Sequence, residues 1–436
     1  MRKEGIGGYI GRLARINLSK EEIKTEELSR ELIMKFLGGN GFGAYILYKE
    51  LSPRIDPFSP ENKIVIATGP ATGTIVPASN KIGVFSKSPL TGLFFDSYAS
   101  GHFGPELKFA GYDAIIIEGK ARRPVYLWIQ DGIIEVRDAT HIWGKDTIEA
   151  QRVVKKEVGD SEAKIATIGP AGENLVRFAN IAFGLRFAGR GGLGAVMGSK
   201  NLKAIAVRGE KHEIAIAQPE KLHKYVDELL EEIKNSPLTK RFRIFGTWAA
   251  LDANNAIGLL GVRNWQEECW EGIEKKIGST AFREKYAIRD VSCYACPIRC
   301  TKFCKVGEGG HEIIVRGPEY ETLYALGTMW GVDNPEYVIK AAELCDRYGL
   351  DTISTGVVIA FAMELFERGI ITKKDTDDLE LRFGNYEAGI QLIKSIAYRR
   401  GFGAILAEGS RRAADMIGRG ADYYACLLYT SPSPRD

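Results

Sequence analysis

The chain's strongest chemical feature is a group of four cysteines within twelve residues. The segment reads Cys293-Tyr-Ala-Cys296-Pro-Ile-Arg-Cys300-Thr-Lys-Phe-Cys304 and holds four of the chain's seven cysteines. Such a group binds a soft metal or forms disulfides. Disulfides are disfavoured because a chain of 436 residues can bury a large core without them and its first residues do not resemble an export signal. The group therefore indicates a metal site.

The spacing of these cysteines separates the candidate metals. A structural zinc site usually comes from two paired clips far apart in sequence, and no second clip is present. Cys-x2-Cys-x3-Cys brings three thiolates round one compact turn, as iron–sulfur clusters require, and the fourth ligand is often distant. We therefore predict an iron–sulfur cluster on Cys293, Cys296 and Cys300, with zinc or free thiols as the alternatives. Cys304 either completes the set or is a bystander.

A second candidate site is the glycine-rich loop Gly189–Gly194, which matches the GxGxxG pattern of dinucleotide-binding folds. Only a short helix fits between Gly191 and Asn201, and the surroundings resemble antiparallel hairpins, so a nicotinamide site is disfavoured. Glycines let backbone N–H groups approach an anion, and we predict phosphate binding, with a tightly packed turn as the alternative. The basic residues expected to assist are Arg190, Lys200 and Lys203.

Two pairs of acidic residues are further candidates. Asp346 and Asp351 flank a predicted helix junction, where they either accept hydrogen bonds from a heterocycle or act as ordinary helix caps. Glu319 and Glu321 follow the cysteines and either serve as a general acid or base or are solvated acids at a helix start. The five histidines show no metal-ligand spacing.

Composition indicates a globular protein. Hydrophobic residues make up 45% and charged residues 26%, and the net charge of +3 is too small to indicate nucleic acid, although it suits phosphate-bearing cofactors or an acidic redox partner. The longest apolar run, 357–363, is too short to span a membrane. We expect a cytoplasmic protein with reduced cysteines and no membrane contact.

The elements that must position these residues fall into two types, which predicts an α+β fold. Residues 1–209 form a β-rich, antiparallel domain, with Asp131-Gly132 as a type I′ hairpin turn and a helix at 147–158. Residues 210–425 form a mostly helical domain that carries the cysteines. The predicted strands are 9–18, 63–68, 81–86, 113–118, 125–130, 133–137, 164–168 and 202–208.

Helix signals in the second half are clear at two places. Apolar residues recur at helical spacing over 219–235. Asn334-Pro335 begins another helix, Gly349 is its C-cap, and the next helix begins with Asp351 or Thr352 as its N-cap. The last residues, 426–436, end in a Ser-Pro repeat that matches a translated sequencing adapter, so we expect a non-native tail on a truncated chain and exclude Cys426 as a ligand.

Several segments taken together resemble the tungsten-containing aldehyde ferredoxin oxidoreductase family, in order and from about Tyr9 to Ala425. These segments are Lys87–Gly92, Glu106–Ala114, Ala188–Gly198, the cysteine loop, Gly317–Thr322 and Asp346–Asp351. The resemblance implies a β-rich domain that holds two pterin cofactors, whose sulfurs bind tungsten or molybdenum without any protein side chain. It also implies a [4Fe-4S] cluster on Cys293, Cys296 and Cys300, with Cys304 as a bystander and the fourth ligand beyond this chain.

The resemblance assigns the remaining site residues by position. Ala188 contributes a backbone contact to a Mg2+ that bridges the pterin phosphates, and Asp346 and Asp351 bind one pterin. Glu321, or less well Glu319, lies beside the tungsten. The residues assigned to cofactor binding are Lys81, Tyr98, Ala188, Gly189, Arg190, Gly191, Gly192, Asp346, Gly349, Leu350 and Asp351. Lys81 and Tyr98 stand where the family leads us to expect Arg and Asn.

By this resemblance the protein oxidises a small aldehyde to a carboxylic acid, with Glu321 assisting proton transfer, and passes electrons singly through the cluster to ferredoxin. Archaeal members carry an E-x-x-H pair that binds an iron between subunits, but the chain has Lys340-Ala-Ala-Glu343 there. We therefore expect any homo-oligomer to form without that iron. The alternatives are a tungsten subunit that reduces an aromatic acyl thioester and a non-catalytic zinc-binding module.

Overall fold

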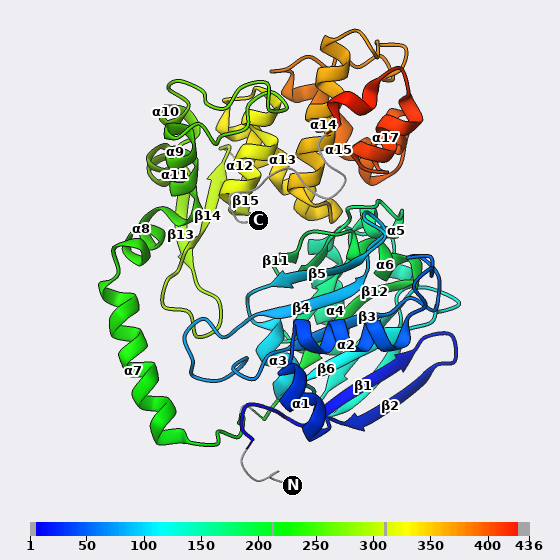
Figure 1. Ribbon diagram of the computed structural model, residues 1–436, viewed down its shortest axis with the longest axis vertical. Helices are drawn as coiled ribbons and strands as arrows, with labels where there is room; N and C mark the ends of the chain where they lie inside the picture. Colours follow the sequence, from blue (N-terminus) through cyan, green and yellow to red (C-terminus); the bar gives the residue numbers. More distant parts are fainter. Residues whose placement is uncertain (1–5, 212, 309–311, 426–436) are drawn as a thin grey trace. The chain divides into compact units, whose positions relative to one another are not determined.

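The structure is a computed structural model that describes residues 6–211, 213–308 and 312–425. The chain forms two compact units, and Figure 1 draws the chain coloured along its sequence. The first unit comprises Met1–Leu175, Ala179–Lys234 and Cys293–Pro297, and the second comprises Val176–Phe178, Asn235–Ser292 and Ile298–Asp436. The predicted tail, 426–436, with Cys426, lies outside the described residues.

The first unit contains two six-stranded sheets, with strand orders β2-β1-β6-β3-β4-β5 and β11-β10-β9-β12-β7-β8. The strands are β1 Arg12–Asn17, β2 Glu22–Glu27, β3 Ile64–Thr68, β4 Ile82–Lys87, β5 Phe94–Ala99, β6 Ala114–Glu118, β7 Val125–Gln130, β8 Ile133–Asp138, β9 Lys164–Thr167, β10 Ile181–Phe183, β11 Arg186–Ala188 and β12 Leu202–Arg208. Pairing is mostly antiparallel, but β1–β6 and β7–β12 are parallel. The predicted β-rich fold is confirmed.

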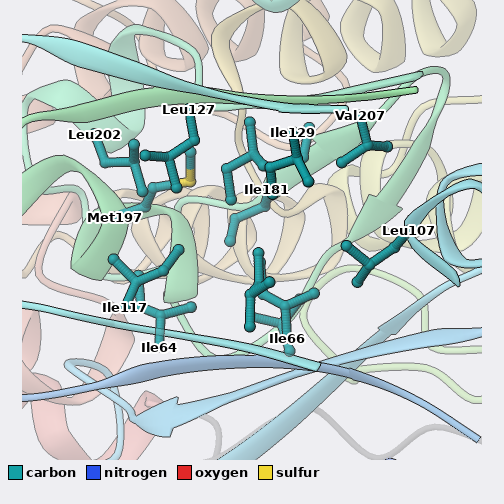
Figure 2. Packing of buried hydrophobic residues seen from close by; sticks show 14 of the residues in the cluster. Ile64, Ile66, Leu107, Ile117, Leu127, Ile129, Ile181, Met197, Leu202 and Val207 are labelled. Atoms are coloured by element: carbon teal, nitrogen blue, oxygen red, sulfur yellow. The ribbon is translucent and has the colours of Figure 1, made fainter. Parts of the chain in front are cut away.

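The two sheets pack face to face around one apolar core. Figure 2 shows Ile64 and Ile66 of β3 pointing toward side chains of the second sheet, such as Ile129. The alternate residues of β3, Val65 and Ala67, belong to a second cluster beneath a helix. Because both faces of β3 are covered, the strand is a continuous apolar run rather than an alternating one. Burying each such side chain contributes about 1.5–3 kcal/mol.

Helices cover the outer faces of both sheets. Helix α2 packs on β3 and β4, and α4 packs on β9 and β12. The helices of this unit are α1 Arg30–Phe36, α2 Asn40–Glu50, α3 Phe103–Phe109, η1 Thr140–Ile142, α4 Thr147–Val158, α5 Pro170–Glu173, α6 Leu193–Ser199 and α7 Pro219–Asn235. The unit is therefore layered as helix, sheet, sheet and helix, a frame able to hold loops in fixed positions.

Most predicted elements of the first unit are confirmed. All eight predicted strands are present, and the helix predicted at 147–158 is α4, capped by Asp146 and ended by Gly159 in the left-handed region. Asp131 and Gly132 both have positive φ, at 46° and 88°, as a type I′ turn requires. Helix α2 was not predicted because its sequence, NGFGAYILYKE, is rich in glycine, and β2 was not predicted because EIKTEE is almost entirely polar.

The second unit is mostly helical but also contains a sheet that the sequence did not predict. Strands β13, β14 and β15 form an antiparallel sheet in which β14 is central. The two edge strands are short and carry exposed residues, so their hydrophobic pattern is weak. The elements are α8 Pro237–Phe245, η2 Gly246–Trp248, α9 Ala249–Ala256, α10 Glu274–Ile277, α11 Ser279–Lys285, β13 Ala287–Val291, β14 Thr301–Val306, β15 Ile313–Arg316, α12 Tyr320–Leu326, η3 Thr328–Trp330, α13 Pro335–Tyr348, α14 Thr352–Glu367, α15 Tyr386–Ala397, α16 Phe402–Leu406, α17 Ser410–Ile417 and η4 Ala421–Tyr424.

The compact units do not divide the chain at a single point. Helix α7, predicted at 219–235, is present but groups with the first unit up to Lys234. The domain boundary predicted between residues 209 and 210 remains a prediction. The compact units are not continuous in sequence, because Cys293–Pro297 belongs to the first unit and Val176–Phe178 to the second. Among the described helices, none is both long enough and apolar enough to cross a lipid bilayer.

Candidate active site

The glycine-rich loop joins β11 to α6 and is held by neighbouring strands. The Ser88 hydroxyl donates a hydrogen bond of 2.6 Å to the Gly191 carbonyl, and the Arg190 N–H donates one of 3.3 Å to the Ser97 hydroxyl. Gly191 and Gly192 have φ of 80° and 74°, a region that glycine enters without strain. The loop is therefore a fixed backbone turn, as a phosphate or cation contact requires.

The other glycines of this segment let α6 pack closely against its neighbours. A Cβ atom on Gly194 would lie 2.1 Å from the Asn180 carbonyl oxygen, and one on Gly198 would lie 2.0 Å from that of Gly172. For these two positions the packing alternative explains the glycine.

Replacing Gly198 with Ala is expected to destabilise the first unit by about 1–3 kcal/mol, because the added methyl group forces backbone apart. Gly69→Ala is the matched control, since the nearest atom to a Cβ there is 3.9 Å away. Urea-unfolding midpoints of the two variants measure the difference. Equal midpoints would show that the close approach costs nothing.

The strand order disfavours a dinucleotide-binding fold. In a Rossmann unit the glycine loop connects two parallel strands of one sheet through a helix. Here β11 and β12 are separated by β10 and β9, and successive antiparallel pairings make β11 antiparallel to β12. The helix between them, α6, has only seven residues, as the sequence spacing predicted.

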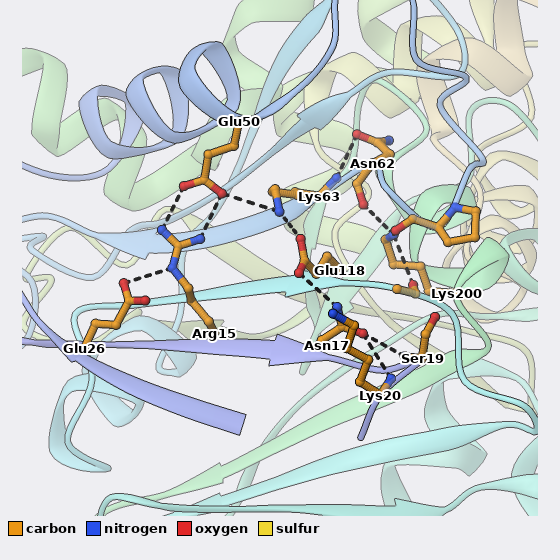
Figure 3. Close-up of polar contacts among 12 residues, drawn as sticks. Arg15, Asn17, Ser19, Lys20, Glu26, Glu50, Asn62, Lys63, Glu118 and Lys200 are labelled. Atoms are coloured by element: carbon orange, nitrogen blue, oxygen red, sulfur yellow. Dashed lines mark hydrogen bonds and ion pairs between the residues drawn. The ribbon is translucent and has the colours of Figure 1, made fainter. Parts of the chain in front are cut away.

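Both lysines that were predicted to add positive charge near the loop are buried and bind other groups. Lys200 Nζ donates hydrogen bonds to the carbonyls of Pro60, Asn62 and Gly119, at 3.0, 2.5 and 3.3 Å, and burial lowers its pKa to about 7. Figure 3 shows Lys200 next to Asn62, near the network in which Lys63 pairs with Glu118. The prediction was wrong because the sequence cannot distinguish a buried lysine that holds loops together from an exposed one.

Lys203 is buried in the same way. Its ammonium pairs with Glu173 at 2.5 Å and donates to the carbonyls of Lys145 and Ile168 at 2.7 and 2.8 Å. Arg190 is then the one basic residue of the predicted set that lies within the loop itself.

The predicted pterin-contact residues of the first unit lie on adjoining strands. Lys81 precedes β4 and is exposed, while Tyr98 lies in β5, which pairs with β4 and contacts β11. Ala188 ends β11 and is fully buried. Burial, and then a hydrogen bond with Asp96, raise the pKa of Tyr98, so its hydroxyl stays protonated. The fold thus brings Lys81, Tyr98 and the glycine-rich loop into one region of the first unit.

The helix junction 346–351 is confirmed as a pair of capped helix ends. Gly349 has φ 75° and ends α13, and the carboxylate of Asp351 accepts hydrogen bonds from the N–H groups of Ile353 and Ser354 at the start of α14. Ser354 Oγ also donates to it at 2.5 Å. A carboxylate has about four acceptor positions, so Asp351 caps α14 and keeps limited capacity for a ligand.

Asp346 is the second candidate of this pair for ring recognition. Burial, and then the nearby Glu343, raise its pKa well above the usual range. Leu350 between the two acids is fully buried, and its N–H donates to the Cys345 carbonyl. A partly exposed carboxyl group with a perturbed pKa at a helix end is typical of functional sites.

The structure separates the two glutamates that the sequence left together. Glu319 accepts hydrogen bonds from the hydroxyls of Thr247 and Thr301, at 2.5 and 3.1 Å, and pairs with Arg316. Its oxygens therefore hold the N-terminal end of α12 in place. Glu321 lies in the first turn of α12 and has a fully buried carboxyl oxygen. Glu321 is the better candidate for proton transfer.

Cys293 and Cys296 lie in a tight turn of the first unit. The Cys296 N–H donates to the Cys293 carbonyl at 3.2 Å. Tyr294 donates a hydrogen bond from its N–H to the Gly101 carbonyl and one from its hydroxyl to the Gly73 carbonyl. The Asn80 side chain also donates to the Tyr294 carbonyl at 2.9 Å. The predicted compact turn is confirmed for these two cysteines, and both are partly exposed.

Cys300 lies in the second unit, just before β14, and its surroundings reveal residues that sequence analysis missed. Arg299 has φ 57°, and its carbonyl accepts a hydrogen bond of 2.9 Å from Lys302 Nζ. A Cβ on Gly246 would lie 2.3 Å from the Cys300 carbonyl oxygen. Lys302 and Gly246 thus shape the backbone at Cys300, and their sequence context gives no signal of this.

Cys304 differs from the other three cysteines of the group. It is fully buried in β14, and burial raises the pKa of its thiol to about 12. A thiol with this pKa stays protonated and is a poor metal ligand, which supports the bystander interpretation. Among the residues described, no three His, Cys, Asp or Glu side chains are gathered in a metal-holding group. The ligand set remains a prediction.

Two family models and several known proteins are similar to this chain. Residues 13–209 match the family described as aldehyde ferredoxin oxidoreductase, N-terminal domain, and residues 224–427 match domains 2 and 3 of that family. The chain is 47% identical over 414 residues to the tungsten-containing aldehyde ferredoxin oxidoreductase of Pyrococcus furiosus, covering 94% of this chain and 68% of the relative.

A more divergent relative and a solved structure are also similar to this chain. An aliphatic sulfonate oxidoreductase, WOR-like subunit, from Pyrococcus furiosus is 39% identical, with coverage of 93% of this chain and 67% of the relative. Among solved structures, the active-site complex of benzoyl coenzyme A reductase with a dienoyl-CoA has a TM-score of 0.87 and 32% identity, over 98% of this chain and 66% of the other. The chain spans about two thirds of the length of these relatives.

The matches to both parts of the chain identify its class as an oxidoreductase. The chain belongs to the tungsten-containing aldehyde ferredoxin oxidoreductase family.

Proposed function

We propose that the complete protein oxidises aldehydes to carboxylic acids at a tungsten bis-pterin centre and passes the electrons through a [4Fe-4S] cluster to ferredoxin. The observation that carries the proposal is the 47% identity, over 94% of this chain, to a relative named for this chemistry. The tungsten bis-pterin centre would supply two-electron oxidation at the metal. The iron–sulfur cluster would transfer the electrons to ferredoxin one at a time.

Residues of the first unit fit the pterin and its phosphates. The glycine-rich loop presents a fixed backbone at Gly191 and Gly192, and Tyr98 offers a protonated hydroxyl from an adjoining strand. Ala188 is a candidate for the backbone contact to Mg2+. A backbone cradle of this kind suits anions because it places N–H dipoles rather than flexible side chains against them.

Residues of the second unit supply recognition and proton transfer. Asp346 would bind the N–H groups of one pterin ring, with Asp351 in the smaller role that its capping bonds leave to it. Glu321 would accept the proton released when water adds to the aldehyde carbon, because a partly buried carboxylate at a helix start is a suitable general base. Glu319 would hold the N-terminal end of α12, and so Glu321, in position.

A second candidate function is the reduction of an aromatic acyl thioester. The similarity to the benzoyl coenzyme A reductase complex, at a TM-score of 0.87, favours it. The identity of 32% is lower than the 47% to the aldehyde-oxidising relative, so we place aldehyde oxidation first.

Elemental analysis and a substrate screen of the full-length protein test the proposal. We expect tungsten or molybdenum near one atom per chain, with ferredoxin reduced by aldehydes and no turnover of aromatic acyl thioesters. Zinc without tungsten would overturn the proposal in favour of a zinc-binding module. Thioester turnover without aldehyde oxidation would favour the second candidate.

Replacing single cysteines is expected to separate ligands from the bystander. Cys300→Ser in the full-length protein should lower the iron and acid-labile sulfide content, because serine replaces a thiolate ligand. Cys304→Ala should leave both unchanged, since its thiol is buried and protonated. Cys269→Ala, at an exposed site, is the control. Loss of iron in Cys304→Ala with retention in Cys300→Ser would reverse the assignment.

The iron-binding pair expected between archaeal subunits is replaced here by residues of α13. Glu343 forms an ion pair with Arg347 one turn away, and Lys340 is exposed. We propose that any homo-oligomer forms without a bridging iron, which iron analysis of the oligomer after removal of the cluster would test.

A further inference from the structure

An exposed basic surface lies around Cys300 in the second unit. Helix α8 contributes three exposed basic side chains, Lys240, Arg241 and Arg243, and its sequence contains no acidic residue. Any acidic partner of these basic side chains must therefore come from another element.

Neighbouring elements extend the same surface. Helix α8 packs on α11 and η2, and α11 packs on β13. Glu284 is the exposed acid among α8, α11, β13 and the turn before β14, while Asp290 pairs with Arg283 and the buried Lys302. We call the following exposed residues the basic surface: Lys240, Arg241, Arg243, Lys285, Arg289 and Arg299.

Part of the basic surface is held in place next to Cys300 by backbone hydrogen bonds. Lys302 Nζ donates hydrogen bonds to the carbonyls of Arg243 and Arg299, at 2.6 and 2.9 Å. The buried Lys302 ammonium group thus holds the backbones of two exposed arginines that lie in separate elements. Gly246, at the end of α8, lies against the Cys300 carbonyl. Two members of the basic surface, Arg243 and Arg299, are therefore held by Lys302 next to the backbone of the predicted third ligand of the cluster.

We propose that the basic surface is the docking site for an acidic one-electron carrier protein of the ferredoxin class. The proposal rests on the proposed function, because the carrier would take electrons from the cluster on Cys293, Cys296 and Cys300. Oxidation of one aldehyde with one water yields one carboxylic acid, two protons and two electrons. Two carrier molecules each accept one of these electrons.

Charge suits this partner better than an apolar interface would. Redox encounters use small interfaces and must dissociate quickly. Opposite charges raise the association rate by about 10- to 1000-fold at low ionic strength without requiring a large buried area. Placing the charges around Cys300 also brings the carrier to the part of the second unit where the cluster would be reached.

Charge reversal in the full-length holoenzyme tests the proposal. We choose Lys240→Glu combined with Lys285→Glu, since both side chains are exposed and neither belongs to the proposed cofactor site. With a purified ferredoxin of acidic net charge as acceptor, kcat/KM should fall by about tenfold or more at low salt. With a viologen dye as acceptor, it should stay at the wild-type value, because a small dye needs no docking surface.

Lys374→Glu combined with Lys394→Glu is the matched control, with the same change in net charge at exposed positions on α15 and on the loop after α14. This control should leave both acceptors unaffected. For the wild type, added salt should lower kcat/KM with ferredoxin but not with the dye, a measurement that needs no variant to fold.

Three results would overturn the docking proposal: an unchanged kcat/KM with ferredoxin, an equal loss with both acceptors, or a ferredoxin rate independent of salt in the wild type. A wild-type protein that holds tungsten and an iron–sulfur cluster, yet gives these results, refutes the docking site alone. A wild-type protein without tungsten refutes the proposed function instead.

Discussion

Glu321→Gln in the full-length enzyme is expected to lower kcat for aldehyde oxidation by about 100- to 10,000-fold, the usual contribution of a general base. Glutamine keeps the shape of the side chain but cannot accept the proton. Cofactor content and the midpoint of thermal unfolding should stay near wild type, because the change is isosteric. Anaerobic assays with a viologen acceptor, together with tungsten and iron analysis, measure each part.

Glu319→Gln is the control, and its expected effect is the opposite. Its carboxylate accepts hydrogen bonds from Thr247 and Thr301 and pairs with Arg316. Loss of this charge should cost about 1–3 kcal/mol of stability, with only a modest effect on kcat. If Glu319→Gln abolishes turnover while Glu321→Gln does not, the two roles must be exchanged.

Lys302→Met is expected to destabilise the second unit by about 3 kcal/mol and to reduce the iron content of the full-length protein. The side chain is 1% exposed, binds the carbonyls of Arg243 and Arg299 and pairs with Asp290, so methionine leaves these three groups without this partner. The Arg299 backbone, with φ 57°, then loses a bond that holds its strained turn at Cys300.

The same substitution should also make the reduction potential of any remaining cluster more negative. Lys302 interacts electrostatically with Cys300, and a buried cation stabilises the extra electron on a reduced cluster. Lys305→Met is the matched control on the same strand, because Lys305 is more exposed and pairs with Glu312. Redox titration followed by EPR compares the two, and equal potentials would show that Lys302 acts on structure alone.

Local sequence signals determined the elements whose cause is itself local. The Asp131-Gly132 turn has the two positive φ angles that its residues favour, and Asn334, Gly349 and Asp351 cap the helices where the sequence placed them. Alternating or continuous apolar runs predicted eight strands for the same reason, since side chains of a strand sort by face within a few residues.

Elements stabilised by distant contacts were not predictable in this way. Helix α2 contains two internal glycines. One of them, Gly43, leaves room for the ring of Phe85, which lies in strand β4. Strand β2 is almost entirely polar and forms because β1 offers it hydrogen bonds at the sheet edge. Pairing across the sheet, rather than propensity, decides such segments.

The candidate site divides in the same manner. Residue types and spacing were enough to predict the kinds of chemistry: thiols for a cluster, glycines for a phosphate turn, and carboxylates for a heterocycle or for proton transfer. Only the tertiary structure decided which members of each set are available. It buries Cys304 as a protonated thiol, commits Glu319 to three partners and turns Lys200 inward to backbone carbonyls. Burial and hydrogen bonding depend on residues far away in the chain, so no local pattern records them.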